Sequence, residues 1–474
     1  MLSEPLDPAR IIGAGETIII RPLYETLVTT DFNWNYAPAL ATSWVASGEG
    51  LTWEFTLRRA VKFHNGYPLS AQDVKFSWER YLDPATNTAG GAALRGIVDS
   101  VDANDDYRVT FRTKAPDPTF LDRLQSVISK KYLGEVGEQR FDKAPVGTGP
   151  FKYAKHSRGE FYEFEAFEDH YAIVPSIRTL NVRIVPEPST RIAMLKTGEA
   201  DFIDGVVGPM IEQVRTTPGA RLIRVPMTSA ADLVVMELYT EEPSPFKDLR
   251  VRRALAHAID RKAIAERLYF SEASPQITPS FFPNTFGFDA SVKEYAYDPD
   301  LAKRLLAEAG YPNGFNTEIT GYASSLMSGI PELLEAVGSY YDKIGVKTKI
   351  TRLDAGTYLA RLREKKLAGL AVHLGLVNRD GGWTAEQYYG EGRPYSSSKD
   401  PAMWELIRRQ AREIDVRKRE ETLKEIVRRG HNTLERIPTV YSNTVFGAGP
   451  RVKDWKPFPG NPYAYGFEYL ALKD

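Results

Sequence analysis

The chain has 474 residues, no cysteine, 61 Lys and Arg against 62 Asp and Glu, and 42% hydrophobic residues. The balanced charge excludes a protein that binds nucleic acid through a broad basic surface. The missing cysteines exclude disulfide scaffolds, Cys-ligated metal centres and thiol catalysis. No apolar run approaches the roughly 18 residues that a membrane-spanning helix needs, and the length predicts about two to four compact units.

The first third of the chain is predicted to be rich in strands. Hydrophobic and polar residues alternate over residues 51–57, which is typical of a half-buried strand. The residues on its apolar face are Leu51, Trp53, Phe55 and Leu57. A strand pair is expected on either side of a turn at residues 103–106, and aromatic residues again alternate with polar ones in residues 145–171.

A helix is predicted to interrupt these strands after Ser70. Ser70 is the expected N-cap, and Asp73 stands three positions later, as in a capping box. Val74, Trp78 and Tyr81 follow at helical spacing and are expected to form one buried stripe.

The middle of the chain is predicted to be helical. Gly198 ends one helix, and Asp260 caps the second of two helices within residues 246–269. A further helix begins after Asp298 and ends at Gly310. Three residues of this helix are expected to face the core: Leu301, Leu305 and Ala309.

Residues 399–436 are the most charged part and predict two amphipathic helices that are separated near Asp415. The tail that follows is again rich in strands and turns. The order of elements favours a mixed α/β chain with two lobes, in which the C-terminal strands return to the first lobe.

Motifs for catalysis, metals and cofactors are weak. No two of the six histidines stand three or four positions apart, and neither a Walker motif nor GxSxG occurs. We therefore predict no cofactor and no metal site. Asp380 and Glu386 flank Trp383 in the most enzyme-like cluster, but a ligand-binding loop or a plain loop explains these residues equally well.

Seven runs of the sequence together carry a family resemblance. They are, in order, RPLYETLV, PALATSWVASGEGLTWEFTLRRAVKFHNGYPLSAQDVKFSWER, PVGTGPFKY, RIAMLKTGEADFI, FKDLRVRRALAHAIDRKAIAERLY, YAYDPDLAKRLLAEAGYPNGF and IGVKTKI. In this order they resemble the bacterial extracellular solute-binding proteins of the peptide/opine/nickel class, known as family 5, which are the capture subunits of ABC importers.

The resemblance implies a large, two-lobed α/β fold of the periplasmic-binding-protein type II class. Lobe I is expected to span residues 1–238, with an inserted strand-rich subdomain at about residues 28–172. Lobe II is expected to span residues 239–439, and residues 440–474 to return to lobe I. A ligand would be enclosed between the lobes by hinge closure.

The resemblance also implies which residues contact the ligand. The expected contacts are Gly13, Ala14, Gly15, Glu16, Phe32, Trp34, Tyr322, Asn378, Arg379, Asp380 and Trp383. For each of them a purely structural role is the competing interpretation.

The loop that contains Arg379 departs from the dipeptide-binding pattern. Dipeptide binders of the family usually carry a Trp early in this loop and an Asp that pairs with the peptide amino group. Leu376 and Gly382 stand at the corresponding positions here, with Asp380 two residues away. This difference disfavours a zwitterionic dipeptide, and Arg379 instead offers a fork for a carboxylate or a phosphate.

These observations predict the substrate-binding component of an ABC importer, without catalysis, that takes a peptide-like or other small polar solute. The expected partners are that ligand and an inner-membrane permease, with no nucleic acid and a monomeric state. The start MLSEP resembles a trimmed or misplaced beginning of an exported protein, so we expect a periplasmic or lipid-anchored location. The alternatives are a hydrolase using Asp380 and Glu386 and a protein that binds extended segments by β-augmentation.

Overall fold

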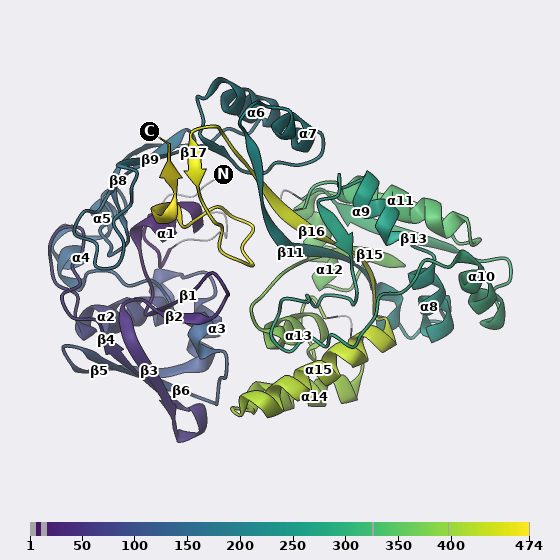
Figure 1. Ribbon diagram of the computed structural model, residues 1–474. Helices are drawn as coiled ribbons and strands as arrows, with labels where there is room; N and C mark the ends of the chain where they lie inside the picture. Colours follow the sequence, from purple (N-terminus) through teal and green to yellow (C-terminus); the bar gives the residue numbers. More distant parts are fainter. Residues whose placement is uncertain (1–5, 11–16, 325–326, 397, 474) are drawn as a thin grey trace.

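The computed structural model describes residues 6–10, 17–324, 327–396 and 398–473. They form two lobes connected by two long paired strands, β11 (Arg221–Val235) and β16 (Arg436–Ala448) (Figure 1). We call the body with β1–β10 and the C-terminal tail lobe I, and the body with α8–α15 lobe II. Within the described residues, no helix combines the length and apolar character needed to cross a membrane.

The two larger sheets in the described part of lobe I are both antiparallel. The first has the order β3-β4-β6-β5, and the second has the order β7-β8-β9. The strands are β3 (Ala41–Ser47), β4 (Thr52–Leu57), β5 (Val98–Asp105), β6 (Arg108–Thr113), β7 (Phe151–Ser157), β8 (Phe161–Ala166) and β9 (Thr179–Arg183). The helices beside them are α1 (Thr17–Leu23), α3 (Gly91–Ile97), α4 (Lys130–Val136) and α5 (Glu138–Phe141).

Helix α2 (Ala71–Leu82) covers the first sheet and confirms the predicted helix start. Ser70 and Asp73 form the reciprocal capping box. The Trp78 ring is fully buried and lies 5.0 Å from the ring of Phe111, centroid to centroid. The buried stripe predicted from the sequence is therefore the face that joins helix and sheet.

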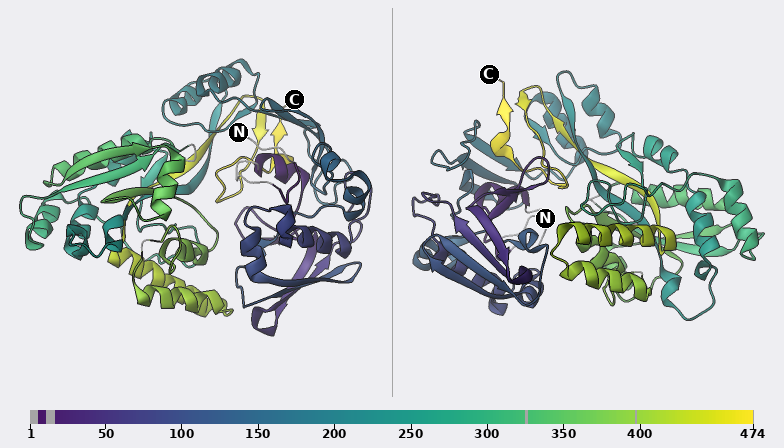
Figure 2. Two further views of the ribbon diagram at one scale, coloured as in Figure 1. Left: turned by 180° about the vertical axis from the view of Figure 1, so that it is seen from behind. Right: turned by 60° about the horizontal axis from the view of Figure 1, so that its bottom comes forward.

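Two short strands and the C-terminal tail complete lobe I. The strands β1 (Val28–Thr30) and β2 (Tyr36–Pro38) form a hairpin, and β17 (Val452–Asp454) pairs with β18 (Ala471–Leu472). Tail side chains pack in one hydrophobic cluster with α1, β7 and β8, so the end of the chain returns to lobe I. Figure 2 shows the same arrangement from behind, with the yellow tail beside the purple N-terminal segment.

Where the lobes join, β10 (Phe202–Ile203) adds to one end of β16. Two helices cover this end, α6 (Pro188–Thr197) and α7 (Met210–Arg215). As predicted, α6 ends at Gly198, which adopts a left-handed conformation at φ 76°.

Lobe II is built on the remainder of a mixed sheet with the order β10-β16-β11-β15-β13-β14, in which β12 also pairs with β16. β13 is parallel to both of its neighbours, and the other pairs are antiparallel. The strands are β12 (Ala273–Pro275), β13 (Asn316–Tyr322), β14 (Lys347–Leu353) and β15 (Leu370–Leu376). The helices are α8 (Leu249–His257), α9 (Arg261–Arg267), α10 (Pro299–Glu308), α11 (Ile330–Asp342), α12 (Ala355–Arg363), α13 (Gly381–Tyr389), α14 (Pro401–Arg412) and α15 (Val416–Thr433).

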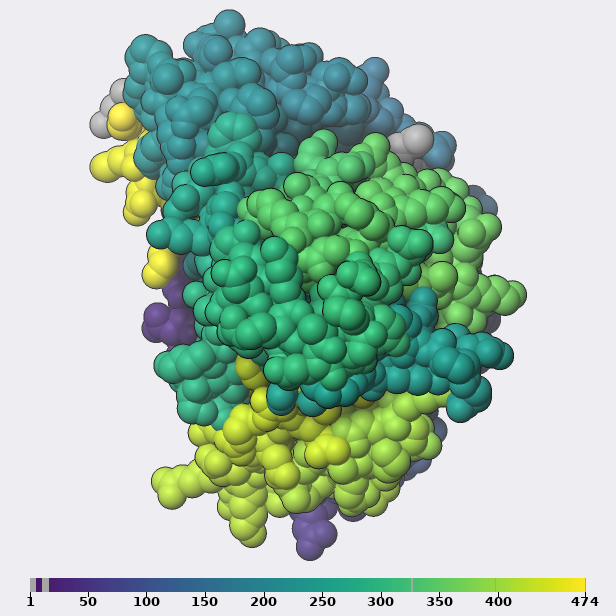
Figure 3. Space-filling model, turned by 90° about the vertical axis from the view of Figure 1, so that its right-hand side faces the viewer, coloured from purple at the N-terminus to yellow at the C-terminus, as the bar shows by residue number. Residues whose placement is uncertain are grey.

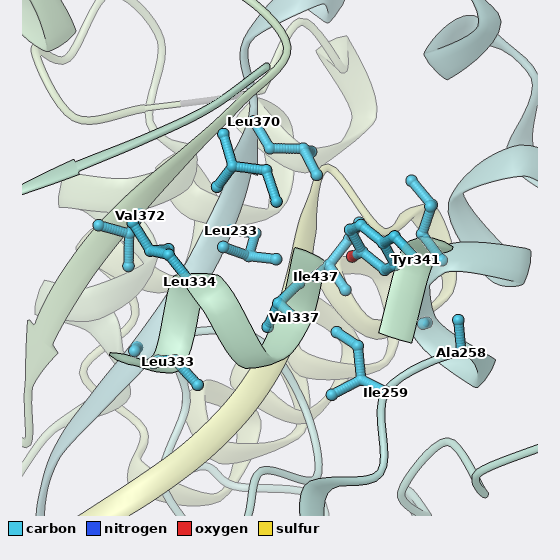
Figure 4. Packing of buried hydrophobic residues seen from close by; sticks show 14 of the residues in the cluster. Leu233, Ala258, Ile259, Leu333, Leu334, Val337, Tyr341, Leu370, Val372 and Ile437 are labelled. Atoms are coloured by element: carbon cyan, nitrogen blue, oxygen red, sulfur yellow. The ribbon is translucent and has the colours of Figure 1, made fainter. Parts of the chain in front are cut away.

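The core of lobe II lies between this sheet and helices α8, α9 and α11. Figure 4 shows Leu334 and Val337 of α11 against Leu233 of β11 and Ile437 of β16, all of which are fully buried. The charged helices α14 and α15 form the lower, yellow-green edge of the face in Figure 3, and Asp415 caps α15 as predicted.

Three details differ from the sequence predictions. The turn between β5 and β6 lies at residues 106–107, because the strand pairing extends through Asp105. In α10 the fully buried residues are Ala302 and Leu306, whereas the expected Leu305 and Ala309 are half-buried and pack against the same core cluster. Leu51 precedes β4 and is 38% exposed, because the ladder begins one residue later.

Candidate functional site

Four of the expected ligand contacts, Gly13, Ala14, Gly15 and Glu16, lie outside the described residues. The other expected contacts fall into three groups: the β1–β2 hairpin of lobe I, the end of β13 in lobe II, and the loop between β15 and α13 together with the first turn of α13.

The turn of the β1–β2 hairpin is held by Asp31. Its carboxylate accepts hydrogen bonds from the backbone N–H groups of Asn35 (2.9 Å) and Asn33 (2.8 Å), which lower the pKa of Asp31. Trp34 adopts the left-handed region at φ 67° within this turn. This turn directs Phe32 and Trp34 to different partners.

Phe32 faces the C-terminal tail. Its ring stacks on Phe458 with centroids 4.3 Å apart, meets Tyr469 edge-on at 5.2 Å, and has the Lys456 ammonium 5.0 Å from its centroid. These contacts fix Phe32 within lobe I, and its contact with a ligand stays a prediction.

Trp34 reaches from the hairpin to lobe II. Its indole packs against a buried cluster that includes Phe282, Val377 and Tyr441. Gly460 of the tail lies against the same indole: a Cβ atom at this glycine would stand 1.9 Å from Cζ2 of Trp34. Residues of lobe II and of the C-terminal tail therefore both contact the Trp34 side chain of the hairpin.

Arg379 makes the polar contact between the lobes. It follows β15, and its guanidinium lies 3.8 Å from the ring centroid of Tyr36 in the hairpin. It donates to the Tyr36 hydroxyl and makes two 3.1 Å hydrogen bonds to the carboxylate of Asp122. Its side chain remains 20% exposed and that of Asp122 34% exposed, so water reaches this pair.

The electrostatics of this contact favour a charged guanidinium. Burial opposes the charge, but the hydrogen bonds and the negative charge of Asp122 prevail and raise the pKa of Arg379. Burial, and next the charge of Asp122, raise the pKa of Tyr36, so the phenol stays neutral. Arg379 is therefore a permanent positive charge at the contact between the lobes.

Asp380, the neighbour of Arg379, points into lobe II. One of its oxygens accepts the N–H of Gly382 at 2.8 Å and so caps α13. Both oxygens accept hydrogen bonds from the Arg419 guanidinium at 2.6 Å, and the residue is only 4% exposed. Its carboxylate is committed to the interior of lobe II.

Asn378 and Glu386 have local roles. The side-chain amide of Asn378 donates to the backbone carbonyl of Leu376 at 3.1 Å, and the backbone carbonyl of Asn378 accepts from the Thr285 hydroxyl at 2.8 Å. The Glu386 carboxylate accepts from Arg393 at 2.6 Å. The structure thus places Asp380 and Glu386 in two separate ion pairs.

Two groups of aromatic contacts in lobe II include the expected contacts Trp383 and Tyr322. Trp383 is 41% exposed, and α13, which carries it, lies on the side of lobe II that faces lobe I (Figure 1). Its ring meets Tyr388 edge-on, and Tyr388 in turn lies 4.8 Å from His373. Tyr322, at the end of β13, stacks on Tyr358 at 4.6 Å.

His373 was not predicted as part of any site. Burial, and next the positive charges of Arg436 and Lys365, hold its pKa well below the usual value, so the imidazole is neutral. The sequence of β15 could have marked it, because His373 interrupts an otherwise apolar strand. Among the described residues, no group of three or more His, Asp or Glu side chains is placed to hold a metal ion.

Comparison with known proteins identifies this arrangement. Residues 35–396 match the model described as bacterial extracellular solute-binding proteins, family 5 Middle. The heme-binding protein A of Haemophilus influenzae is 31% identical over 392 residues, which cover 76% of this chain and 70% of that protein.

Solved structures extend the similarity to almost the whole chain. HbpA2 from Haemophilus parasuis superposes with a TM-score of 0.87 at 27% identity, over 99% of this chain and 97% of that one. The ABC transporter-associated periplasmic binding protein DppA from Helicobacter pylori, in complex with the peptide STSA, superposes with a TM-score of 0.79 at 27% identity. This match covers 100% of this chain and 96% of that one. The predicted two-lobed α/β fold class is thus confirmed, and the chain belongs to the bacterial extracellular solute-binding proteins, family 5.

Proposed function

We propose that this protein captures a small polar solute that carries a carboxylate, such as a peptide, between its two lobes and delivers it to an ABC permease in the membrane. The observation that carries the proposal is Arg379, a permanent cation of lobe II that reaches Tyr36 and Asp122 of lobe I. A carboxylate on the solute would offer this guanidinium the bidentate partner that it prefers. In the relatives the named ligands include the peptide STSA, agropinic acid and glutathione.

Hinge closure is part of this proposal. Only β11, β16 and the residues around them connect the lobes in the described chain (Figure 1). The register between these strands shifts between Val225 and Ser229, and Met227 within the shift has φ 48°. Rotation of one lobe against the other breaks the fewest ladder hydrogen bonds where the pairing of the connecting strands is irregular. We therefore place the hinge near Met227.

We keep the predicted domain bounds as part of the proposal: residues 1–238 for lobe I with an insertion at 28–172, residues 239–439 for lobe II, and 440–474 returning. The proposed solute contacts are Phe32, Trp34, Tyr322, Asn378, Arg379 and Trp383, together with residues 13–16. Asp380 is withdrawn as a contact, because its carboxylate is buried against Arg419.

The location and assembly state follow from the same role. A capture subunit meets its solute outside the inner membrane, so we propose a periplasmic or lipid-anchored protein that works as a monomer. The family is one of extracellular solute-binding proteins, which agrees with this location.

The hydrolase alternative is wrong. Members of this family are non-catalytic binding proteins. Asp380 and Glu386, which would have served as acid and base, are each paired with an arginine.

The test measures thermal unfolding of the full chain against a panel of peptides, opines and other carboxylates, each with its neutral amide analogue. A solute at a hundredfold excess over its Kd should stabilise the native state by about 2.7 kcal/mol. Arg379→Gln should weaken a carboxylate solute at least tenfold and leave its amide analogue unaffected. Arg361→Gln, a change at an exposed arginine of α12, is the matched control.

Two outcomes would contradict the proposal. One is a solute whose affinity is the same in Arg379→Gln as in the unmodified protein. The other is small-angle scattering that shows no compaction when a saturating solute is added, because hinge closure requires the lobes to approach.

A further inference from the structure

One apolar side chain makes a further contact between the lobes, separate from the polar contact of Arg379. Ile414 lies between α14 and α15, at the end of this helix pair that points towards lobe I (Figure 1). Its Cδ1 atom lies against Gly50, which belongs to the turn between β3 and β4. The contact therefore joins the tip of a helix pair in lobe II to a turn of the lobe I sheet.

This contact requires a glycine at position 50. Gly50 is buried and has φ 85°, in the left-handed region that residues with a side chain rarely adopt. A Cβ atom here would stand 2.5 Å from Cδ1 and 3.0 Å from Cγ1 of Ile414, whereas ordinary contacts of a Cβ atom are 3.4–4 Å long. The same position is 3.8 Å from Cβ of Pro116. The Ile414 side chain thus occupies space that any side chain at position 50 would need.

Lobe I holds its side of the contact by its own hydrogen bonds. The Gly50 carbonyl accepts the Thr113 hydroxyl at 3.3 Å, and the Leu51 carbonyl accepts the Thr113 N–H at 2.9 Å. Thr113 is the last residue of β6 and is only 5% exposed. The turn is therefore tied to the sheet and moves with lobe I.

Lobe II holds Ile414 in a similar way. Asp415, the next residue, caps α15 by accepting the N–H of Arg417 at 3.0 Å. The N–H of Asp415 donates to the Glu413 carboxylate at 2.9 Å. Because each side of the contact is fixed within its own lobe, rotation at the hinge would separate the two sides and leave these local hydrogen bonds intact.

Ile414 is an apolar residue in the most charged part of the chain. Its neighbours Asp415 and Arg417 are exposed, and Val416, two positions further on, is 64% exposed. Ile414 itself is half-buried. Separation from Gly50 would return apolar surface of Ile414 to water, so the contact favours the arrangement in which the lobes touch.

We propose that Ile414 and the turn at Gly50 form a latch that stabilises the closed arrangement of the lobes. The latch rests on the hinge closure proposed above and adds to it a contact that needs no solute. Such a contact raises the closed fraction of the solute-free protein. The affinity for a solute that is held in the closed form rises with that fraction.

The test measures the distance between the lobes in the full chain without solute. Because the sequence has no cysteine, Ala85→Cys in lobe I and Ala402→Cys in lobe II, both at exposed positions, provide unique sites for spin labels. Double electron–electron resonance then gives the distance distribution. Gly50→Ala should shift it to longer values, because the added methyl group overlaps Ile414. Gly66→Ala is the matched control and should cause no shift: its φ is 86°, but no atom of the described residues lies within 4 Å of an added Cβ.

A second pair of variants removes the apolar contact instead of overfilling it. Ile414→Ala should also shift the distribution to longer distances, whereas Val416→Ala, at the exposed neighbour, should not. Gly50→Ala combined with Ile414→Ala relieves the overlap, so its distribution should match that of Ile414→Ala alone.

Unchanged distances in both Gly50→Ala and Ile414→Ala would overturn the latch. Equal shifts in Gly50→Ala and Gly66→Ala would also overturn it, because they would assign the effect to backbone strain. The proposed function has a separate readout, the solute affinity of Arg379→Gln, so failure of the latch and failure of the proposed function are distinguishable.

Discussion

At the scale of single residues, contacts decide between roles that residue type leaves open. Asp380 and Arg379 are neighbours in one loop, and both have the chemistry of a ligand contact. The Asp380 carboxylate is turned into lobe II, where Arg419 and the start of α13 satisfy it. The Arg379 guanidinium is turned outward to the other lobe. Only Arg379 is therefore placed to exchange its present partner for a solute.

Asp380→Asn should destabilise the protein by about 3 kcal/mol, because it leaves the Arg419 guanidinium buried without a counter-charge. Urea unfolding measures this change. Glu386→Gln, which breaks a partly exposed pair with Arg393, is the control and should cost less than about 1 kcal/mol. Solute affinity that falls in Asp380→Asn without loss of stability would instead make Asp380 a ligand contact.

At the scale of elements, the β1–β2 hairpin is held between two partners. Phe32 on one side of its tip packs on the C-terminal tail, and Trp34 on the other reaches lobe II. Gly460 makes this arrangement possible, since it supplies both a positive φ of 73° and the space for the indole. The tail thereby supports the element that contacts lobe II.

Gly460→Ala should destabilise the protein and displace the Trp34 indole, because the new methyl group would overlap the ring. Gly392→Ala is the matched control: its φ is 67°, but nothing lies within 4 Å of the added carbon. Both changes strain the backbone, so the difference between their unfolding free energies isolates the steric contact. We expect this difference to be about 1–3 kcal/mol. Equal losses would show that the indole moves aside without cost.

At the scale of the whole molecule, buried ionisable groups make the free energy of unfolding depend on pH. Glu435 precedes β16 and is nearly buried, with one oxygen accepting the Ser398 hydroxyl at 3.3 Å and the other without a partner. Burial raises the pKa of Glu435 from 4.5 to about 7. The folded protein therefore holds a proton on this group that the unfolded chain releases at lower pH.

The sign of the pH effect follows from this difference. The native contribution of protonated Glu435 is fully present below pH 4.5 and is lost as the pH rises to about 7. Glu435→Gln cannot ionise, so its stability relative to the unmodified protein should rise over that window by on the order of 3 kcal/mol. Urea unfolding at pH 4.5 and pH 7.5 measures it. A difference that does not change between the two pH values would contradict the prediction.

The sequence predicted those parts of the fold whose causes are local. The capping box of α2 and the Asp260 cap of α9 involve residues only three positions apart, so spacing alone identifies them. The pairing of Arg379 with Asp122 joins residues 257 positions apart, and nothing near either residue marks the other. The same holds for Asp380 and Arg419, which is why residue type alone did not indicate that Asp380 forms a buried ion pair.

The pairing of β11 with β16 also has a consequence for the order of folding. Val234 pairs with Arg436, 202 positions further along the chain. Closing so long a loop is slow, because its entropy is lost before the ladder forms. A nascent chain that has reached β15 still lacks β16, the second neighbour of β11, so both lobes should remain incomplete until nearly the entire polypeptide has been synthesised.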